Sequence, residues 1–187
     1  GFERAELGWL DYTTLTSNTD TVTTLSTLGD SNKAYIVRVP NNENEYFILE
    51  NRQQEGWDKY LPGHGMLVWH IDMDEYAWYN NQVNTDANHQ RVDIVEADGK
   101  ATSHTLSGDP FPGTSNVKQF SFKAWNGNKL FGFNDVAEDN GTITFLLDSA
   151  GINIPAPDSI IIKDVADSSF TMEWSPVENA NYYLVSL

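Results

Sequence analysis

The chain has 187 residues, of which 40% are hydrophobic and 12% aromatic, and it contains no cysteine. This length and composition suit one ordinary domain, or one domain with part of another, and exclude a disordered tail. The 27 acidic and 11 basic side chains give a net charge of −16, which repels nucleic acids and anionic membranes. No apolar run approaches the ~18 residues of a membrane span, so we expect no membrane insertion.

In chain order, the predicted elements are mostly strands. Residues 1–10 read as the tail of a helix from an upstream domain, closed by Gly8. The Ser- and Thr-rich stretch that follows, 10–28, favours strands over helix. Further strands are predicted at 34–39, 46–51, 65–71, 92–97, 119–122 and 142–147, with one short helix within 74–81. This spacing predicts an all-β domain, a sandwich or jelly roll, over residues 11–150.

The composition changes after residue 149. Residues 151–157 contain two prolines and a glycine and read as a linker. Beyond it, a strand at 160–162 precedes an alternating strand at 170–174 that carries Trp174, and another strand is predicted at 182–187. The segment 158–187 resembles the start of a fibronectin type III module, truncated after its third strand. The alternative is a local β-ribbon that completes the first domain.

Acidic side chains gather near the ends of predicted strands. Alternation places His70 and Asp72 on one face of their strand, and Glu96 and Asp98 on one face of theirs. Calcium takes six to eight oxygen ligands, and glycines beside the acidic residues would let carbonyl groups contribute. The candidate structural calcium ligands are therefore Asp72, Glu96, Asp98 and Asp109. The alternative is that these carboxylates are solvated turn residues.

His70 has several possible roles. We expect it to be a half-buried histidine that bonds to Glu50 or Asp72, rather than a catalytic base. A zinc site that joins His70 to His64 or His89 is a weaker alternative, because the spacings match no familiar zinc pattern.

The neighbouring Glu50 and Arg52 lie on one face of a predicted strand. We expect them to form an ion pair or a hydrogen-bonded support for the loop that ends at Gly56.

Aromatic side chains suggest a second kind of site. A sugar-stacking platform could be formed by Trp57, Trp69, Trp78, Tyr79 and Trp125. Trp69 has core-like neighbours, and the better candidates are Trp78, Tyr79 and Trp125, which fall in polar segments. The alternative function is therefore a carbohydrate-binding or adhesion module of a cell-surface protein.

The sequence lacks the motifs of common catalysts. It contains no HExxH, no GxxxxGK[ST], no GxGxxG and no GxSxG. We therefore expect that this chain is not itself an enzyme. An unrecognised hydrolase that uses His70 with Asp72 or Glu96 is the remaining catalytic hypothesis.

Four segments occur in a distinctive order. They are RAELGW at 4–9, EYFILENRQQEGWDKYLPGHGMLVWHID at 45–72, VDIVEADG at 92–99 and GDPFPG at 108–113. Together they resemble the region that follows the catalytic domain in secreted bacterial zinc metalloproteases of the immune inhibitor A type. The resemblance covers residues 2–147, and the segment 45–72 is its most specific part.

The resemblance implies that catalysis belongs to a different domain from the one in this chain. In that family the zinc and its HExxH ligands belong to an upstream catalytic domain, on which a β-sandwich packs. It implies that this chain is the non-catalytic part of a metallopeptidase, secreted or at the cell surface. The expected partner is the chain's own upstream catalytic domain, with a glycan or a protein substrate as further possibilities.

Overall fold

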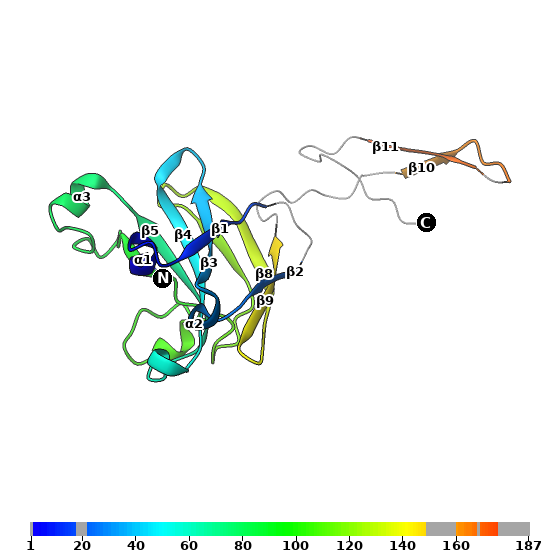
Figure 1. The fold of residues 1–187 in the computed structure, drawn as a ribbon. Helices are drawn as coiled ribbons and strands as arrows, with labels where there is room; N and C mark the ends of the chain where they lie inside the picture. Colours follow the sequence, from blue (N-terminus) through cyan, green and yellow to red (C-terminus); the bar gives the residue numbers. More distant parts are fainter. Residues whose placement is uncertain (1, 18–21, 149–159, 168, 176–187) are drawn as a thin grey trace. The chain divides into compact units, whose positions relative to one another are not determined.

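The computed structural model describes residues 2–17, 22–148, 160–167 and 169–175. The contacts divide the chain into two units, Gly1–Ala150 and Gly151–Leu187. The first unit is an all-β sandwich of two sheets with a few short helices, as the strand spacing predicted (Figure 1).

Sheet A has the strand order β1-β3-β4-β5-β6. Its strands are β1 (Asp11–Thr14), β3 (Lys33–Val39), β4 (Asn42–Arg52), β5 (Gly65–Asp72) and β6 (Val92–Ile94). β1 runs parallel to β3, while every other neighbouring pair is antiparallel. The predicted strands 34–39, 46–51 and 65–71 are confirmed, and β4 is longer than predicted because the turn before it needs only Pro40 and Asn41.

Sheet B is fully antiparallel and has the order β2-β9-β8-β7. Its strands are β2 (Val22–Leu25), β9 (Thr142–Asp148), β8 (Lys129–Asp139) and β7 (Phe120–Lys123). The predicted strands 119–122 and 142–147 are confirmed. β8 was not predicted, although it is one of the two longest strands.

The helices are short and lie at the ends of the strands. They are α1 (Phe2–Glu6), α2 (Leu28–Ser31), α3 (Glu75–Tyr79) and the two 3₁₀ turns η1 (Gly56–Asp58) and η2 (Leu106–Gly108). The predicted helix within 74–81 is confirmed as α3, where the Asp74 carboxylate accepts a hydrogen bond from the Ala77 amide. Gly8 follows α1 with φ of +70°, as expected of a glycine that ends a helix.

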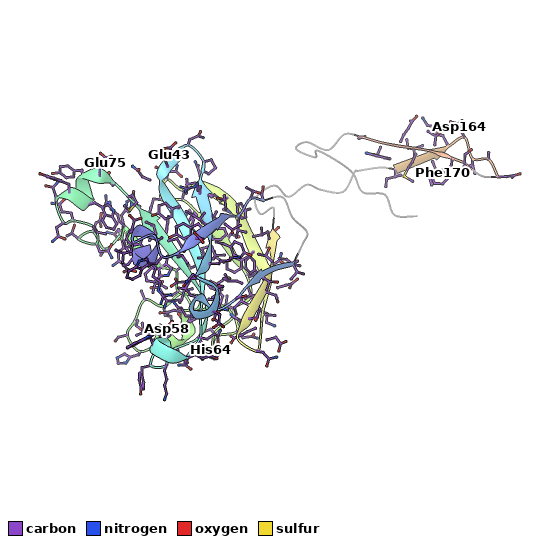
Figure 2. All side chains as sticks on the ribbon, in the orientation of Figure 1. Glu43, Asp58, His64, Glu75, Asp164 and Phe170 are labelled. Carbon is purple, nitrogen blue, oxygen red and sulfur yellow. The ribbon has the colours of Figure 1, made fainter. Side chains whose placement is uncertain are left out.

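The main core fills the space between the two sheets (Figure 2). Alternate residues of each strand point inward, so Ile143, Phe145 and Leu147 of β9 are all buried, as predicted. They meet Phe47 and Leu49 of β4 in the same cluster. Several phenylalanines pack edge-on or tilted there, with ring centroids 5.0–5.8 Å apart.

A second core covers the outer face of sheet A. Ile48 of β4 and Ile71 of β5 pack there with Phe2 of α1 and Leu28 of α2. Because both faces of sheet A are covered, β4 is buried without interruption from Glu45 to Asn51. Polar side chains on these strands must therefore find partners inside the protein.

In the second unit, the structure describes an antiparallel pair, β10 (Ile160–Lys163) and β11 (Thr171–Trp174). These confirm the strands predicted at 160–162 and 170–174. Ile160, Ile161 and Ile162 are 49–58% exposed. The predicted linker at 151–157 and the predicted strand at 182–187 lie outside the described residues.

Candidate functional site

The loop between β6 and β7 folds back onto the end of β5. Met66 and Phe111 exchange two backbone hydrogen bonds of 2.7 and 2.8 Å. The Ala97 amide donates to the Asp109 carbonyl at 3.0 Å, so the acidic segment 96–98 lies beside η2. This arrangement brings together three of the four predicted calcium ligands, Glu96, Asp98 and Asp109, which we call the acidic cluster.

Gly108 shows how closely the acidic cluster is packed. A β-carbon added to Gly108 would lie 2.8 Å from Oδ2 of Asp98 and 2.7 Å from Oγ of Ser115. The Asp98 carboxylate and the Ser115 hydroxyl therefore lie against the α-carbon that precedes Asp109. Oδ1 of Asp98 accepts a hydrogen bond from the Lys100 amide at 2.9 Å, which leaves Oδ2 on the Gly108 side.

Asp109 is the most deeply buried member of the acidic cluster. It is only 7% exposed, and its buried Oδ1 atom has no hydrogen-bond partner. Burial, followed by repulsion from Glu96 and Asp98, raises the pKa of Asp109 to about 6. Burial and Glu96 also raise the pKa of the nearby Asp93. Within the described ranges, no Lys, Arg or His forms an ion pair with any residue of the acidic cluster.

Asp72, the fourth predicted calcium ligand, lies elsewhere. The prediction assumed that the C-terminal ends of the strands converge, but β6 runs antiparallel to β5. Asp72 is therefore at one end of β5, while the acidic cluster lies beyond Met66 at the other, about 20 Å away at roughly 3.3 Å per residue. Asp72 instead bonds to His89 at 2.8 Å and lies 3.6 Å from Nε of Arg91.

Four aromatic rings form a continuous stack at the Asp72 end of β5. His70 lies between Phe47 and Trp125, with ring centroids 4.1 and 4.8 Å away. Trp125 also stacks on the ring of His89, at 4.3 Å. We call these four residues the aromatic stack. Both imidazoles stack on the indole, and Nε2 of each bonds to a different carboxylate, so the zinc site that would join His70 to His89 finds no support in this geometry.

Buried carboxylates fix the aromatic stack. Nε2 of His70 lies 2.8 Å from Oε1 of Glu45, which also accepts the Trp125 amide hydrogen at 2.7 Å. The expectation that His70 bonds to Glu50 or Asp72 is therefore wrong. Burial lowers the pKa of His70, and the hydrogen bond to Glu45 only partly opposes this shift. A histidine that is 7% exposed and covered on both faces is a structural residue.

His64, the other zinc candidate, is paired with Glu138 at 2.9 Å. In the part of the chain that the structure describes, no group of three or more His, Asp or Glu side chains could hold a metal ion by itself.

The predicted pair of Glu50 and Arg52 is confirmed at 3.2 Å. Arg52 also bonds to Asp58 at 2.8 Å, and the indole of Trp69 donates to Glu50 at 3.0 Å. Burial alone would lower the pKa of Arg52, but Glu50 and Asp58 together raise it. These contacts hold η1 against the end of β4.

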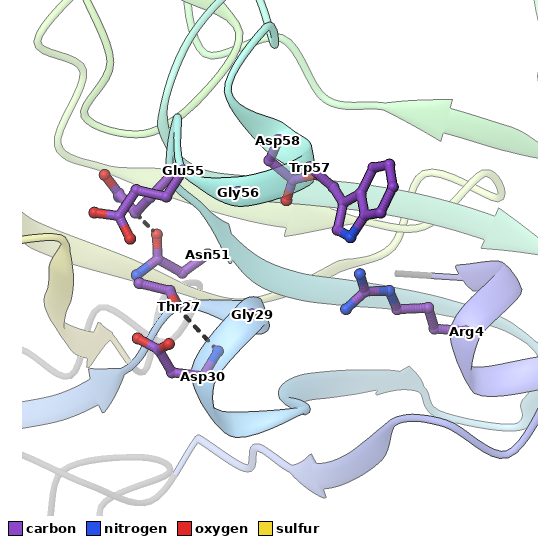
Figure 3. Close-up of a pocket in the computed structure, with 10 residues that line it drawn as sticks. Arg4, Thr27, Gly29, Asp30, Asn51, Glu55, Gly56, Trp57 and Asp58 are labelled. Atoms are coloured by element: carbon purple, nitrogen blue, oxygen red, sulfur yellow. Dashed lines mark hydrogen bonds between the residues drawn. The ribbon is translucent and has the colours of Figure 1, made fainter.

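A pocket of about 290 Å³ lies beside η1. Figure 3 shows Arg4 of α1 and Trp57 of η1 at this pocket, with Asp30 and Glu55 also on its lining. Trp57 is 100% exposed. The sequence analysis did not predict this pocket. The polar segment 53–58 after a buried strand could have pointed to it, but Arg4 could be placed there only by the fold.

The predicted sugar platform is not assembled as one surface. The indole of Trp78 donates to the Asp72 carbonyl at 2.8 Å, and its ring packs on Phe2 at 5.4 Å. Trp125 belongs to the aromatic stack. Tyr79 is 91% exposed and is free to contact a ligand.

Comparison of the chain with protein-family models, with curated proteins and with solved structures gave no match. Among the described residues, no helix is both long and apolar enough to cross a membrane.

Proposed function

We propose that this chain is a non-catalytic β-sandwich region of a secreted zinc metallopeptidase and that it packs against the catalytic domain of the same protein. The proposal combines the ordered motif resemblance at 4–9, 45–72, 92–99 and 108–113 with one structural observation. In this proposal, zinc and its ligands belong to the catalytic domain, and the second unit begins a fibronectin type III module.

The structural observation is a set of exposed apolar side chains in or just after α1 and η1, the two elements that bring Arg4 and Trp57 to the pocket, and we infer that they form one surface. Trp57 is 100% exposed and Tyr60, just after η1, is 88% exposed. Leu7 and Trp9, just after α1, are 59% and 65% exposed. Contiguous apolar side chains on a soluble domain usually mark a surface that a partner covers. We call these four residues the aromatic rim.

The aromatic rim has the composition of a binding surface. Tryptophan and tyrosine contribute the largest binding energies at interfaces, and Arg4 supplies a charged group at the same pocket as Trp57. The polar groups of Asp30 and Glu55 at the pocket could pair with donors of the partner. The role of the chain would then be to hold one wall of the catalytic domain in place.

The direct test is to isolate the intact protein that contains this sequence from culture medium. We expect one polypeptide that contains an HExxH segment and whose peptidase activity is abolished by a zinc chelator. A polypeptide without such a domain would refute the proposal.

Hydrogen exchange then tests the surface. Amides of residues 56–60 and 7–9 should exchange at least tenfold more slowly in the intact protein than in the isolated chain. Residues 86–88, an exposed turn far along the sequence, serve as the control segment. Equal exchange at 56–60 in both proteins would show that the aromatic rim is not the contact surface.

A carbohydrate-binding function has one observation in its favour, since Trp57 lies beside polar groups in a pocket. It predicts that Trp57 stays exposed in the intact protein and that polysaccharide protects residues 56–60. The exchange experiment therefore separates the two functions.

A further inference from the structure

The acidic cluster has no counter-charge within the described residues. Glu96 and Asp98 follow β6, and Asp109 follows η2, yet the backbone bond between Ala97 and Asp109 brings them together. The carboxylates of Glu96 and Asp98 repel that of Asp109. The free-energy cost of such repulsion rises as the carboxylate is buried. A positive charge beside them would remove that cost.

Asp109 provides the observation that points to a ligand. It is only 7% exposed, and its Oδ1 atom is enclosed without a hydrogen-bond donor. Burial of an unpaired carboxylate oxygen is costly, so such atoms usually have a partner of some kind. The charges of Glu96 and Asp98 act on this side chain and repel it.

Other oxygen atoms are available at the same place. The Asp98 carboxylate and the Ser115 hydroxyl both lie close to the β-carbon position of Gly108, at 2.8 and 2.7 Å. The Asp109 carbonyl, which accepts the Ala97 amide at 3.0 Å, adds a backbone oxygen between the two segments. A site with only oxygen donors, no histidine and irregular backbone suits calcium better than zinc or magnesium.

We propose that Glu96, Asp98 and Asp109 bind one calcium ion, which ties the segment after β6 to η2. The side chains do not surround one point by themselves, so carbonyl groups, Ser115 and water complete the shell. Asp72 has no part in this site, because it lies at the other end of β5. This calcium site does not depend on the proposed function.

The experiment is a calcium titration of the whole chain after treatment with EDTA. We expect one binding event by calorimetry and a rise in melting temperature of about 5 °C in excess calcium chloride. Magnesium chloride at the same concentration should produce a clearly smaller rise, because magnesium loses its water reluctantly. An equal rise with magnesium, or none with calcium, would overturn the assignment.

Two variants locate the site. Asp109→Asn and Asp98→Asn keep the size of each side chain and remove one charge, and the amide oxygen introduced at position 98 can still accept the Lys100 amide hydrogen. Both should weaken calcium binding at least tenfold without lowering the melting temperature in EDTA. Asp167→Asn, at an exposed position of the second unit, is the matched control and should bind calcium normally. Undiminished binding by both cluster variants would refute the proposed ligands.

Discussion

Glu45 accepts three hydrogen bonds although only 3% of it is exposed. The donors are the ring of His70, the backbone amide of Trp125 and the side-chain amide of Asn42. A buried carboxylate is tolerated when several donors surround it, and its loss leaves those donors without partners. Glu45 therefore links two sheets through charge and hydrogen bonding.

Replacement of Glu45 should be costly. We expect Glu45→Ala to lower the free energy of unfolding by about 3 kcal/mol, because two buried donors lose their acceptor. Urea denaturation measures this change. Glu43→Ala, two residues earlier and exposed, is the matched control and should stay within about 0.5 kcal/mol of the wild type. Similar values for both variants would show that the bonds to Glu45 contribute little.

His70 should make stability depend on pH. Burial lowers its folded-state pKa below the ordinary value of 6.5, so the unfolded chain takes up the proton first as the pH falls. The contribution of His70 is complete above pH 6.5 and is lost as the pH falls from there to its folded pKa. Glu45, Asp72, His89 and Arg91 are the charged groups that face the aromatic stack.

Urea midpoints of the wild type and of His70→Gln, measured between about pH 7.5 and about pH 5.5, test this. We expect the wild type to lose more stability than the variant over that range. His104→Gln removes an exposed histidine and should follow the wild type. Parallel curves for the wild type and His70→Gln would contradict the effect of burial.

The sequence placed His70 correctly on a buried strand face but named the wrong partner. Its partner, Glu45, lies on the same sheet one strand away, paired to Asp72 in register. Period-two alternation predicts which face a residue occupies, but not which neighbouring strand it meets. The same limit explains why Asp72 was grouped with the acidic cluster.

At the scale of elements, the turn after β7 joins the two sheets. Trp125 lies in this turn of sheet B, while both histidines that contact it belong to sheet A or to the segment beside it. The contact holds the two sheets together and continues the phenylalanine core, because Phe47 belongs to both.

Trp125→Ala should therefore destabilise the protein by about 3 kcal/mol, because two stacked contacts are lost and a cavity forms. Denaturation midpoints measure the effect, and the amides of 124–128 should exchange faster. Trp57→Ala, at the fully exposed tryptophan, is the control and should change stability by less than about 0.5 kcal/mol. Equal losses would mean that the aromatic stack is not a structural link.

β8 shows why a long strand can escape prediction. Its pairing with β9 shifts between Asn134 and Ala137, so one extra residue sits in β8. Asp135 at this bulge has φ of +52°. The next buried position after Phe133 is consequently Val136, three residues later instead of two. This spacing interrupts the period-two alternation on which strand prediction depends. The regular strands β5 and β9 were predicted almost to their ends.

At the scale of the whole molecule, the two units differ in their cores. Every residue of both buried clusters lies before residue 150. The described strands of the second unit expose most of their apolar side chains. The first unit therefore has buried clusters large enough to stabilise it independently. An isolated pair of strands is only marginally stable in water.

A chain of residues 1–150 should melt within about 2 °C of the full chain, since it keeps every residue of the two buried clusters. A thermal melt followed by circular dichroism measures this. A chain of residues 1–139 lacks β9 and is the control, which should not fold. A large loss of stability in the 1–150 chain would show that the second unit supports the sandwich.

The full exposure of Trp57 has an optical consequence. A water-facing indole emits at longer wavelength than a buried one and can be reached by dissolved iodide, so part of the fluorescence of this chain should be quenched at low iodide concentration. Loss of that quenchable fraction would report coverage of the surface beside η1 in any preparation, without a dye or a label. The intrinsic fluorescence of Trp57 therefore reports whether a partner covers this surface.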